Sequence, residues 1–100
     1  QSRQASFPKP ANRVKFFFTD YPKGAKKGAV GLVQARLSVA ADGSINNCSI
    51  VRSSGDAVLD QATCSIFVRR VKKMEPARDK IGQPMASLYV FSRLWSVPVP

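Results

Sequence analysis

Residues 31–52 read GLVQARLSVAADGSINNCSIVR, and this stretch decides the fold. In its first half, apolar side chains alternate with Gln, Arg and Ser, which is the period of two expected of a half-buried strand. The Asp42-Gly43 pair that follows is a strong signal for a hairpin turn. A second strand is predicted over residues 44–52, where the apolar side chains do not alternate cleanly and indicate a bulge near Asn46-Asn47. The stretch therefore predicts two antiparallel, neighbouring strands.

A helix is predicted directly after this hairpin. Its start is marked by Ser54 or Asp56, because either side chain can accept hydrogen bonds from the first free backbone N–H groups. Aspartates in the first turns and basic residues in the last ones match the polarity of the helix dipole. Pro76 is expected to end the helix. The side chains expected to be buried follow the spacing i, i+3, i+4, i+7, and they are Leu59, Ala62, Thr63, Ile66 and Phe67.

A final strand is predicted over about residues 85–95. Because the helix lies between the second and third strands, the third strand can return antiparallel beside the first. The predicted fold class is therefore α+β: a two- to three-stranded antiparallel sheet in the order 2-1-3, with one crossover helix packed on one face and a short N-terminal helix. In this arrangement the last strand is an edge of the sheet. Both of its faces are apolar, which indicates either cover on both sides or a partner that completes it.

The part of the chain before the hairpin carries weaker signals. Residues 1–19 are expected to be a linker or tail, because residues 1–13 are polar, contain two prolines and show no apolar period. The segment VKFFF at 14–18 indicates a short additional strand at an edge. From Pro22, the sequence PKGAKKGA is compatible with one or two turns of helix, although its glycines weaken a helix. The folded domain is expected to span residues 20–97.

The chain is strongly basic. It carries 16 Lys and Arg residues against 6 Asp and Glu residues, a net charge of +10. A field of this sign attracts polyanions of every kind, including nucleic acid, anionic lipid, lipopolysaccharide and wall polymer, without selecting among them. No apolar run approaches the roughly 20 residues with which a helix spans a bilayer.

Cys48 and Cys64 are the only cysteines. They can form one disulfide, as in an exported protein, or remain buried free thiols in a cytosolic one. A disulfide is favoured, because Cys48 falls in the second predicted strand and Cys64 in the helix that must pack near it. Closing this loop is worth roughly 3 kcal/mol in the chain-entropy model.

Signals for enzymatic chemistry are missing from the sequence. The segment YPKGAKKGAVG at 21–31 fails as a phosphate-binding loop, because Gly24 and Gly28 are one residue too close and Ala29 stands where such a loop needs lysine. The chain contains no histidine, which excludes the common nucleophilic triads and most zinc sites. We therefore predict that the protein is not an enzyme and has no cofactor and no metal site.

Nucleic-acid binding has support from the charge and from aromatic residues that could stack on bases. These are Phe16, Phe17, Phe18, Tyr89, Phe91 and Trp95. However, no predicted strand carries the Lys/Arg-Gly-aromatic signature of an RNA-recognition sheet. Aromatic residues on a last strand more often belong to the core, so we do not expect nucleic acid to be a partner.

Several short motifs occur in an order that resembles the C-terminal domain of TonB-family energy transducers. Each motif is weak alone, but together they surround the same strand-strand-helix-strand pattern, and the resemblance covers about residues 20–96. The motifs are YP at 21–22, G-x-V at 31–33, V-x-x-D-G at 39–43, SSG at 53–55, LD at 59–60, PA at 76–77 and G-x-P at 82–84. The cysteine pair is also similar to a variant found among TonB-like proteins.

The resemblance implies a periplasmic module that binds the Ton box, the N-terminal peptide of TonB-dependent outer-membrane transporters. The family binds this peptide by β-augmentation, in which an extended peptide adds a strand to a sheet edge. A second contact region of the family lies at the YP turn, here Tyr21 and Pro22. The residues implied to form the peptide-binding edge are Ala86, Ser87, Leu88, Tyr89, Val90, Phe91, Ser92 and Arg93.

The full family protein is an energy transducer, which transmits force from a proton-driven motor complex in the inner membrane. It does so through an anchor helix and a long Pro-rich spacer, so contact with the motor is expected only through such N-terminal segments, which are missing from residues 1–100. Two other outcomes stay open. The chain could be a free-standing secreted module whose basic surface binds cell-wall polymer, lipopolysaccharide or another envelope protein. Two copies could also form a homodimer by pairing their last strands.

Overall fold

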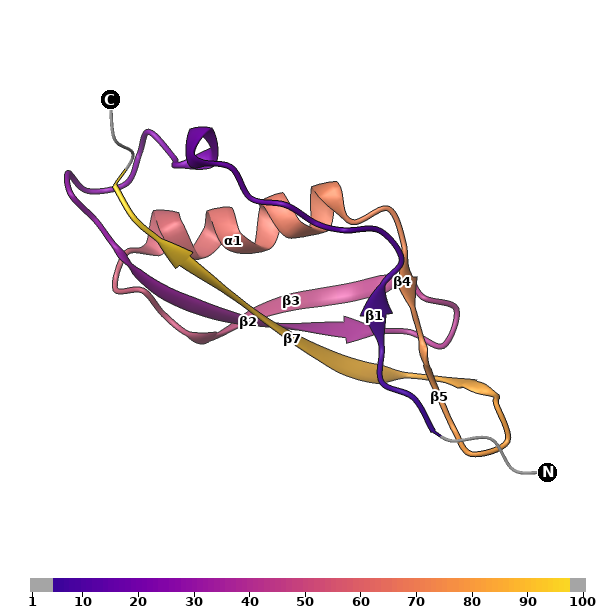
Figure 1. Cartoon of the computed structure of the whole chain (residues 1–100). Coiled ribbons are helices and arrows are strands. Elements are labelled where there is room, and N and C mark those ends of the chain that lie inside the picture. The colour runs from indigo at the N-terminus through magenta and orange to yellow at the C-terminus, as the bar shows by residue number, and fades with distance from the viewer. Residues whose placement is uncertain (1–4, 98–100) are drawn as a thin grey trace.

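The predicted hairpin is present in a computed structural model of the protein, which describes residues 5–97 (Figure 1). β2 (Gly31–Val39) pairs antiparallel with β3 (Ile45–Arg52). In the turn between them, the N–H of Gly43 donates to the carbonyl of Ala40 at 2.9 Å. The register shifts at two places, and one shift leaves Asn46 without a partner in β2, so the bulge predicted near Asn46-Asn47 is confirmed.

α1 (Ala57–Arg70) follows the hairpin and begins where the sequence predicts. The carboxylate of Asp56 accepts hydrogen bonds of 2.9 and 3.1 Å from two N–H groups of the first turn, as expected of an N-cap residue. One turn further on, the carboxylate of Asp60 accepts hydrogen bonds from the hydroxyls of Ser53 and Ser54. This carboxylate therefore ties the end of β3 to the start of the helix.

The helix ends at Arg70, earlier than the predicted stop at Pro76. Val71 is extended and caps the helix. The following backbone groups bond to the N-terminal segment instead of to the helix. The N–H of Lys72 donates to the Asn12 side chain at 2.7 Å, and the Lys73 carbonyl accepts from the N–H of Ala11 at 2.8 Å. Hydrogen bonds to a distant segment thus end the helix before proline does.

β7 (Ser87–Trp95) lies antiparallel beside β2 and completes the three-stranded sheet. The strand order β3-β2-β7 confirms the predicted order 2-1-3 and the α+β class. The pairing runs without a shift from Gly31 opposite Trp95 to Val39 opposite Ser87. β2 is therefore the central strand, and β7 forms one edge.

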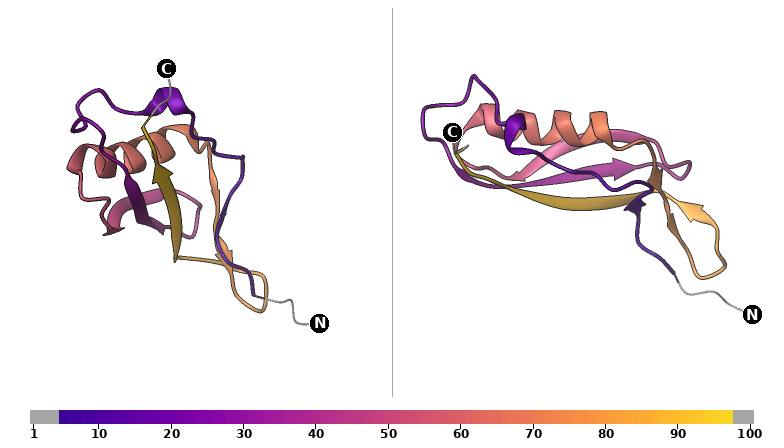
Figure 2. Two further views of the ribbon diagram at one scale, coloured as in Figure 1. Left: turned by 60° about the vertical axis from the view of Figure 1, so that its left-hand side comes forward. Right: turned by 45° about the horizontal axis from the view of Figure 1, so that its top comes forward.

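α1 covers one face of this sheet, while no helix or strand of residues 5–97 lies over the other face (Figure 2). The side chains of β2 on the covered face are fully or almost fully buried, and they are Val33, Ala35, Leu37 and Val39. The other buried apolar residues of the core are Leu59, Ile66, Phe67, Val71, Met74, Ala77 and Trp95. β7 thus has cover on one face only, and cover on both faces is not found in the described chain.

The N-terminal segment from residue 5 to residue 20 is folded onto the domain, in contrast to the expected tail. β1 (Lys9–Pro10) pairs antiparallel with β4 (Met74–Glu75). The strand predicted at 14–18 is wrong, because residues 14–17 lie in no strand and Phe18–Asp20 form a 3-10 helix, η1. The side chains of Val14 and Phe16 pack against the core. Their alternation therefore reflects side-chain packing and not strand pairing.

The short N-terminal helix is present as η1, but its predicted position after Pro22 is wrong. Residues 22–29 form turns and no helix. Gly28 has a positive φ of 76°, which ends any right-handed helical path there. The N–H of Lys26 donates to the carboxylate of Asp56 at 3.0 Å. The loop is therefore fixed by the cap of α1 and not by helical hydrogen bonds of its own.

The polar connection predicted before the last strand contains a small hairpin. β5 (Ala77–Arg78) pairs with β6 (Pro84–Met85). The carboxylate of Asp79 accepts from two N–H groups of the turn, at 2.9 and 3.0 Å. The hairpin lies at the end of the molecule opposite the C-terminus and contributes to an elongated shape of 55 × 22 × 19 Å (Figure 1).

A disulfide between Cys48 and Cys64 joins β3 to α1, so the alternative of two free thiols is wrong. We expect replacement of both cysteines by alanine to lower the free energy of unfolding by about 3 kcal/mol, since the unfolded chain then gains the entropy of an open loop. Urea unfolding of both proteins measures the difference. A loss below about 1 kcal/mol would contradict this expectation.

Gly43 gives a second test of the fold, at the turn of the hairpin. It is buried with φ at +89°, and a Cβ added there would collide with the carbonyl oxygen of Met74. We expect Gly43→Ala to lower the free energy of unfolding by about 2–4 kcal/mol. Gly28→Ala is the matched control, because its φ is also positive but no atom lies within 4 Å of the added Cβ. That variant should lose only about 1 kcal/mol, and equal losses in urea unfolding would refute the role of the close contact.

Candidate functional site

The three-stranded sheet has two outer edges among residues 5–97, formed by the bulged strand β3 and by the longer strand β7. Along its inner edge β7 pairs with β2, whereas its outer edge pairs with no strand of residues 5–97. A strand of nine residues is roughly 30 Å long and directs about half of its N–H and C=O groups outward. This edge is therefore a template for a further strand.

The side chains of β7 alternate between the two faces of the sheet. Tyr89, Phe91 and Arg93 are partly covered on the side of α1, and Trp95 is buried there. The ring of Phe91 stacks on that of Phe67 from α1, with centroids 3.9 Å apart and planes inclined by 18°. This stacking holds the middle of β7 against the helix, so the edge is presented on a rigid strand.

Trp95 fixes the C-terminal end of β7. Its indole N–H donates to the hydroxyl of Thr63 in α1 at 2.8 Å, and this hydroxyl donates in turn to a helix carbonyl. The rings of Phe16 and Tyr21 contact the indole edge to face, with centroids 6.0 and 6.2 Å away. The buried indole of Trp95 thus contacts α1, the N-terminal segment and the YP turn at the C-terminal end of β7.

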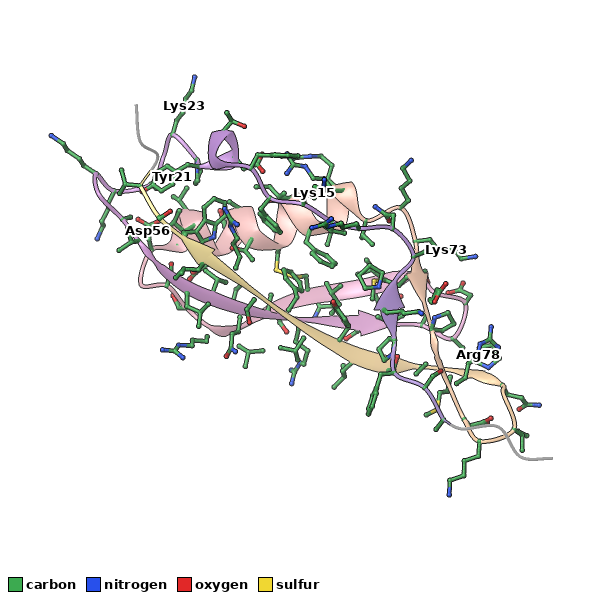
Figure 3. All side chains as sticks on the ribbon, viewed as in Figure 1. Lys15, Tyr21, Lys23, Asp56, Lys73 and Arg78 are labelled. Atoms are coloured by element: carbon green, nitrogen blue, oxygen red, sulfur yellow. A yellow bond between two sulfur atoms is a disulfide. The ribbon has the colours of Figure 1, made fainter. Side chains whose placement is uncertain are left out.

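The YP turn is fixed independently of any ligand. The hydroxyl of Tyr21 donates to the carbonyl of Ala29 at 2.6 Å and closes the loop. Hydrogen bonds from the N–H groups of Lys26 and Leu59 keep the pKa of the Asp56 carboxyl below its usual value, so this carboxylate stays charged while it holds the loop. Tyr21, Lys23 and Asp56 lie at the same end of the molecule, around the C-terminal end of β7 (Figure 3).

Arg93 contributes a positive charge beside the edge. Its guanidinium lies 5.1 Å from the centroids of both the Phe16 and the Trp95 rings, in cation–π contact with each. The Nε atom is buried and has no hydrogen-bond partner in the described chain. The positive charge of Arg93 is therefore held beside the edge by two aromatic rings.

The N-terminal segment is held beside β7 by an ion pair. The Arg70 guanidinium donates two hydrogen bonds to the Asp20 carboxylate, at 2.5 and 2.6 Å, and a third to the carbonyl of Lys15 at 2.9 Å. The hydrogen bonds from Arg70 to the carboxylate, together with the one from the N–H of Phe17, lower the pKa of Asp20 from 3.8 to about 2. Residues 15–20 are therefore fastened to the end of α1 while Phe16 reaches Arg93 and Trp95.

The structure brings most of the sequence-predicted site residues into one region. The residues from Ser87 to Arg93 are in β7, and Tyr21 joins them through Trp95. Ala86 is not part of β7, because the preceding residues Pro84–Met85 pair with β5 in a separate sheet. The function of the predicted site residues in peptide binding stays a prediction.

Phe16, Asp20 and Trp95 belong to this region but were not expected in the site. The aromatic run at 14–18 and the apolar alternation up to Trp95 indicate that these side chains are buried. They do not indicate which residues the side chains contact. Phe16 and Trp95 pack against each other, and Tyr89 and Phe91 pack against Phe67, so these rings do not form a free stacking platform for bases.

Other site chemistries find no counterpart among residues 5–97. No group of three or more His, Cys, Asp or Glu residues is placed there to hold a metal ion. Within the same residues, no helix has the length and apolar character needed to cross a membrane.

Comparison with known proteins agrees with this geometry. The family model described as Gram-negative bacterial TonB protein C-terminal matches residues 19–94. The matched range contains β2, β3, α1, the YP turn and β7 up to Leu94. No curated protein and no solved structure gives a significant match.

The Asp20–Arg70 pair predicts a pH dependence of stability. Because the pKa of Asp20 is lowered to about 2 in the folded protein, the pair stabilises the fold fully above pH 4 and loses this contribution as the pH falls toward 2. We expect Asp20→Asn to lower the free energy of unfolding by about 1–2 kcal/mol at pH 7 and by little at pH 2. Urea unfolding of both proteins between pH 2 and pH 7 measures the difference. A difference that does not change with pH would show that the charge on Asp20 does not matter.

Proposed function

The chain belongs to the family of Gram-negative TonB C-terminal domains, and on this basis we propose that it binds the Ton box of TonB-dependent outer-membrane transporters by adding this peptide as a strand to β7. TonB C-terminal domains are periplasmic, non-enzymatic transducer and binding domains that interact with outer-membrane transporters. We propose the periplasm as the location of this chain as well. The Cys48–Cys64 disulfide supports an oxidising compartment.

The observation that carries the proposal is the unpaired outer edge of β7. Backbone hydrogen bonds are each worth about 0.5–1.5 kcal/mol net, so an added strand with roughly four or five of them gains several kcal/mol before side chains contribute. β7 is held by β2 along its whole length and by Phe67 and Thr63 of α1. The edge therefore needs no rearrangement to accept a peptide, which keeps the entropic cost of binding low.

Side chains of β7 would select among peptides. On the side of α1, alternate peptide side chains would meet Tyr89, Phe91 and Arg93, where the guanidinium favours a carboxylate or a carbonyl. Where the peptide extends beyond Trp95, it would reach the turn at Tyr21 and Pro22. The backbone groups of the edge alone would accept a peptide in several registers. These side-chain contacts would favour one register over the others.

Strand addition also suits a domain that transmits a pull. Several backbone hydrogen bonds lie side by side along an added strand, so a force along the peptide loads them together and not one after another. In a longer chain, force from the inner-membrane motor complex would enter through N-terminal segments. Residues 6–12 are hydrogen-bonded to the segment after α1, which supports such a path into the domain.

We expect a synthetic Ton box peptide to shift the backbone amide NMR signals of residues 87–95 and of the Tyr21 turn. N-methylation of the peptide separates backbone pairing from side-chain contact. In an added strand, alternate N–H groups of the peptide bond to β7 and the others point away. Methylating one alternate set should abolish binding, while methylating the other set should change the affinity less than about threefold.

Three results would contradict this assignment. The first is equal loss of affinity for both methylated peptides. The second is a set of shifts that avoids residues 87–95 and follows the lysines, with an affinity that falls steeply with salt, because this marks polyanion binding through the basic surface. The third is a homodimer, detected by sedimentation, that pairs its β7 edges and excludes the peptide at all accessible concentrations.

A further inference from the structure

The face of the sheet that points away from α1, here called the open face, carries an apolar row along β7. Leu88, Val90 and Leu94 are 57%, 54% and 66% exposed, and they alternate with the covered residues of the strand. Ser92 is the one polar residue of β7 that lies between them on this face. Side chains two positions apart on a strand lie roughly 7 Å apart, so this row is about 20 Å long. An exposed apolar row of this length is typical of an interaction surface.

The open face also carries positive charge that has no partner in the described chain. Arg36 of β2 lies opposite Val90 of β7, and Arg52 of β3 lies opposite Gln34 of β2. Both arginine side chains are exposed. β2, β3 and β7 contain no Asp or Glu at all. The two ion pairs found among residues 5–97, at Glu75 and Asp20, involve neither arginine.

The six acidic residues of the chain are all engaged elsewhere. Asp20 binds Arg70, Asp42 binds Ser44, Asp56 caps α1, Asp60 binds Ser53 and Ser54, Glu75 pairs with Lys9, and Asp79 binds N–H groups of its own turn. Among residues 5–97, a second copy of the chain therefore offers this face no side-chain carboxylate that is not already hydrogen-bonded or paired. Stacking two open faces would bring four arginines together with no carboxylate from either sheet, which is unfavourable.

A bilayer is a poor occupant as well. Four polar residues share the open face with the apolar row, as their pairing across the sheet shows. Ser38 lies opposite Leu88 and Asn47, Gln34 opposite Ser92 and Arg52, and Ser49 opposite Arg36. Insertion into hydrocarbon would remove water from these polar groups without giving them partners. The apolar row on β7 and the two arginines on β2 and β3 instead fit a ligand with apolar groups along one side and negative charges along the other.

We propose that the open face is a second binding surface, for an amphipathic polypeptide segment with apolar side chains along one side and carboxylates along the other. A helix about 10 Å wide covers two strand spacings, so its apolar side would lie on the β7 row while its carboxylates reach Arg36 and Arg52. The side chains of this face point out of the sheet, whereas the ladder groups of the β7 edge lie in its plane. The surface shares Leu88 and Val90 with the proposed Ton box edge, but it binds through side chains and through Arg36 and Arg52, whereas the edge binds through its ladder groups. The arginine variant described below therefore tests the two proposals separately.

A designed helical peptide tests this proposal on the intact chain. The probe carries leucines along one side and glutamates along the other, and its partner peptide carries lysine in place of each glutamate. Leu32 of β2 lies opposite Leu94 and is a further reporter of this face. We expect the glutamate peptide to shift the methyl NMR signals of Leu32, Leu88, Val90 and Leu94, and the lysine peptide to leave them unchanged. Arg36→Gln combined with Arg52→Gln should weaken binding about three- to tenfold.

Matched variants separate this surface from general attraction to a basic protein. Lys23→Gln combined with Lys27→Gln removes the same charge from two exposed residues of the YP loop and should change the affinity less than twofold. Leu88→Ser should weaken binding, whereas Val68→Ser on the exposed side of α1 should not. The arginine variant should also bind the Ton box peptide as the wild type does, so a failure here does not affect the edge assignment.

The proposal is overturned by any of four results. These are equal weakening by the lysine and arginine variants, equal binding of both designed peptides, no methyl shift at about 1 mM of the glutamate peptide, and methyl shifts that follow self-association of the free protein. A fifth result would overturn it as well: binding of phosphatidylglycerol vesicles at these methyls in place of the peptide, because the occupant would then be a membrane and not a polypeptide.

Discussion

β2 is hydrogen-bonded to β3 along one edge and to β7 along the other, while its alternate side chains fill the space beneath α1. Because the side-chain period of a strand is two, a slip of one residue would turn Val33, Ala35, Leu37 and Val39 away from the helix. The register of β2 therefore fixes which side chains of both neighbours are covered. It also determines that β3 and β7 form the two outer edges of the sheet, and that Leu88, Val90 and Leu94 stay in contact with water.

The elements that the sequence predicts correctly are those with strong local signals. The hairpin follows from alternation around an Asp-Gly turn, and α1 follows from its spacing and from Asp56, so the order of the strands needs only the rule for crossover connections. The N-terminal segment has no such signal. Val14 and Phe16 show the same period of two that a strand would show. They pack against a core cluster that includes Phe67 and Val71, more than fifty positions away, and Phe16 also contacts Arg93. Strands of two residues, such as β1 and β4, are too short to produce any period.

The candidate edge was predictable for the same reason as the topology, because an unpaired last strand follows from the strand order. The open face was not predictable in this way. Its composition depends on which residues of three strands share a side, and two register shifts in β3 change that set. The sheet also lacks carboxylates while all six acidic residues are used to fix turns, helix ends and the N-terminal segment. The net positive charge of the protein is therefore balanced mainly by its binding partners.

The pairing of Gly31 with Trp95 connects nearly the two ends of the folded chain, whereas β2, β3 and α1 are neighbours in sequence. Contacts of high sequence separation form late, because the entropy of closing a long loop opposes them until most of the structure exists. We therefore expect the hairpin and helix to form first and to offer β2 as an unpaired edge to β7. In that order the last step of folding is itself a strand addition, and it creates the edge that we propose for the peptide. β7 is thus the first strand that adds to this side of the sheet, and a peptide bound at its outer edge would be the second.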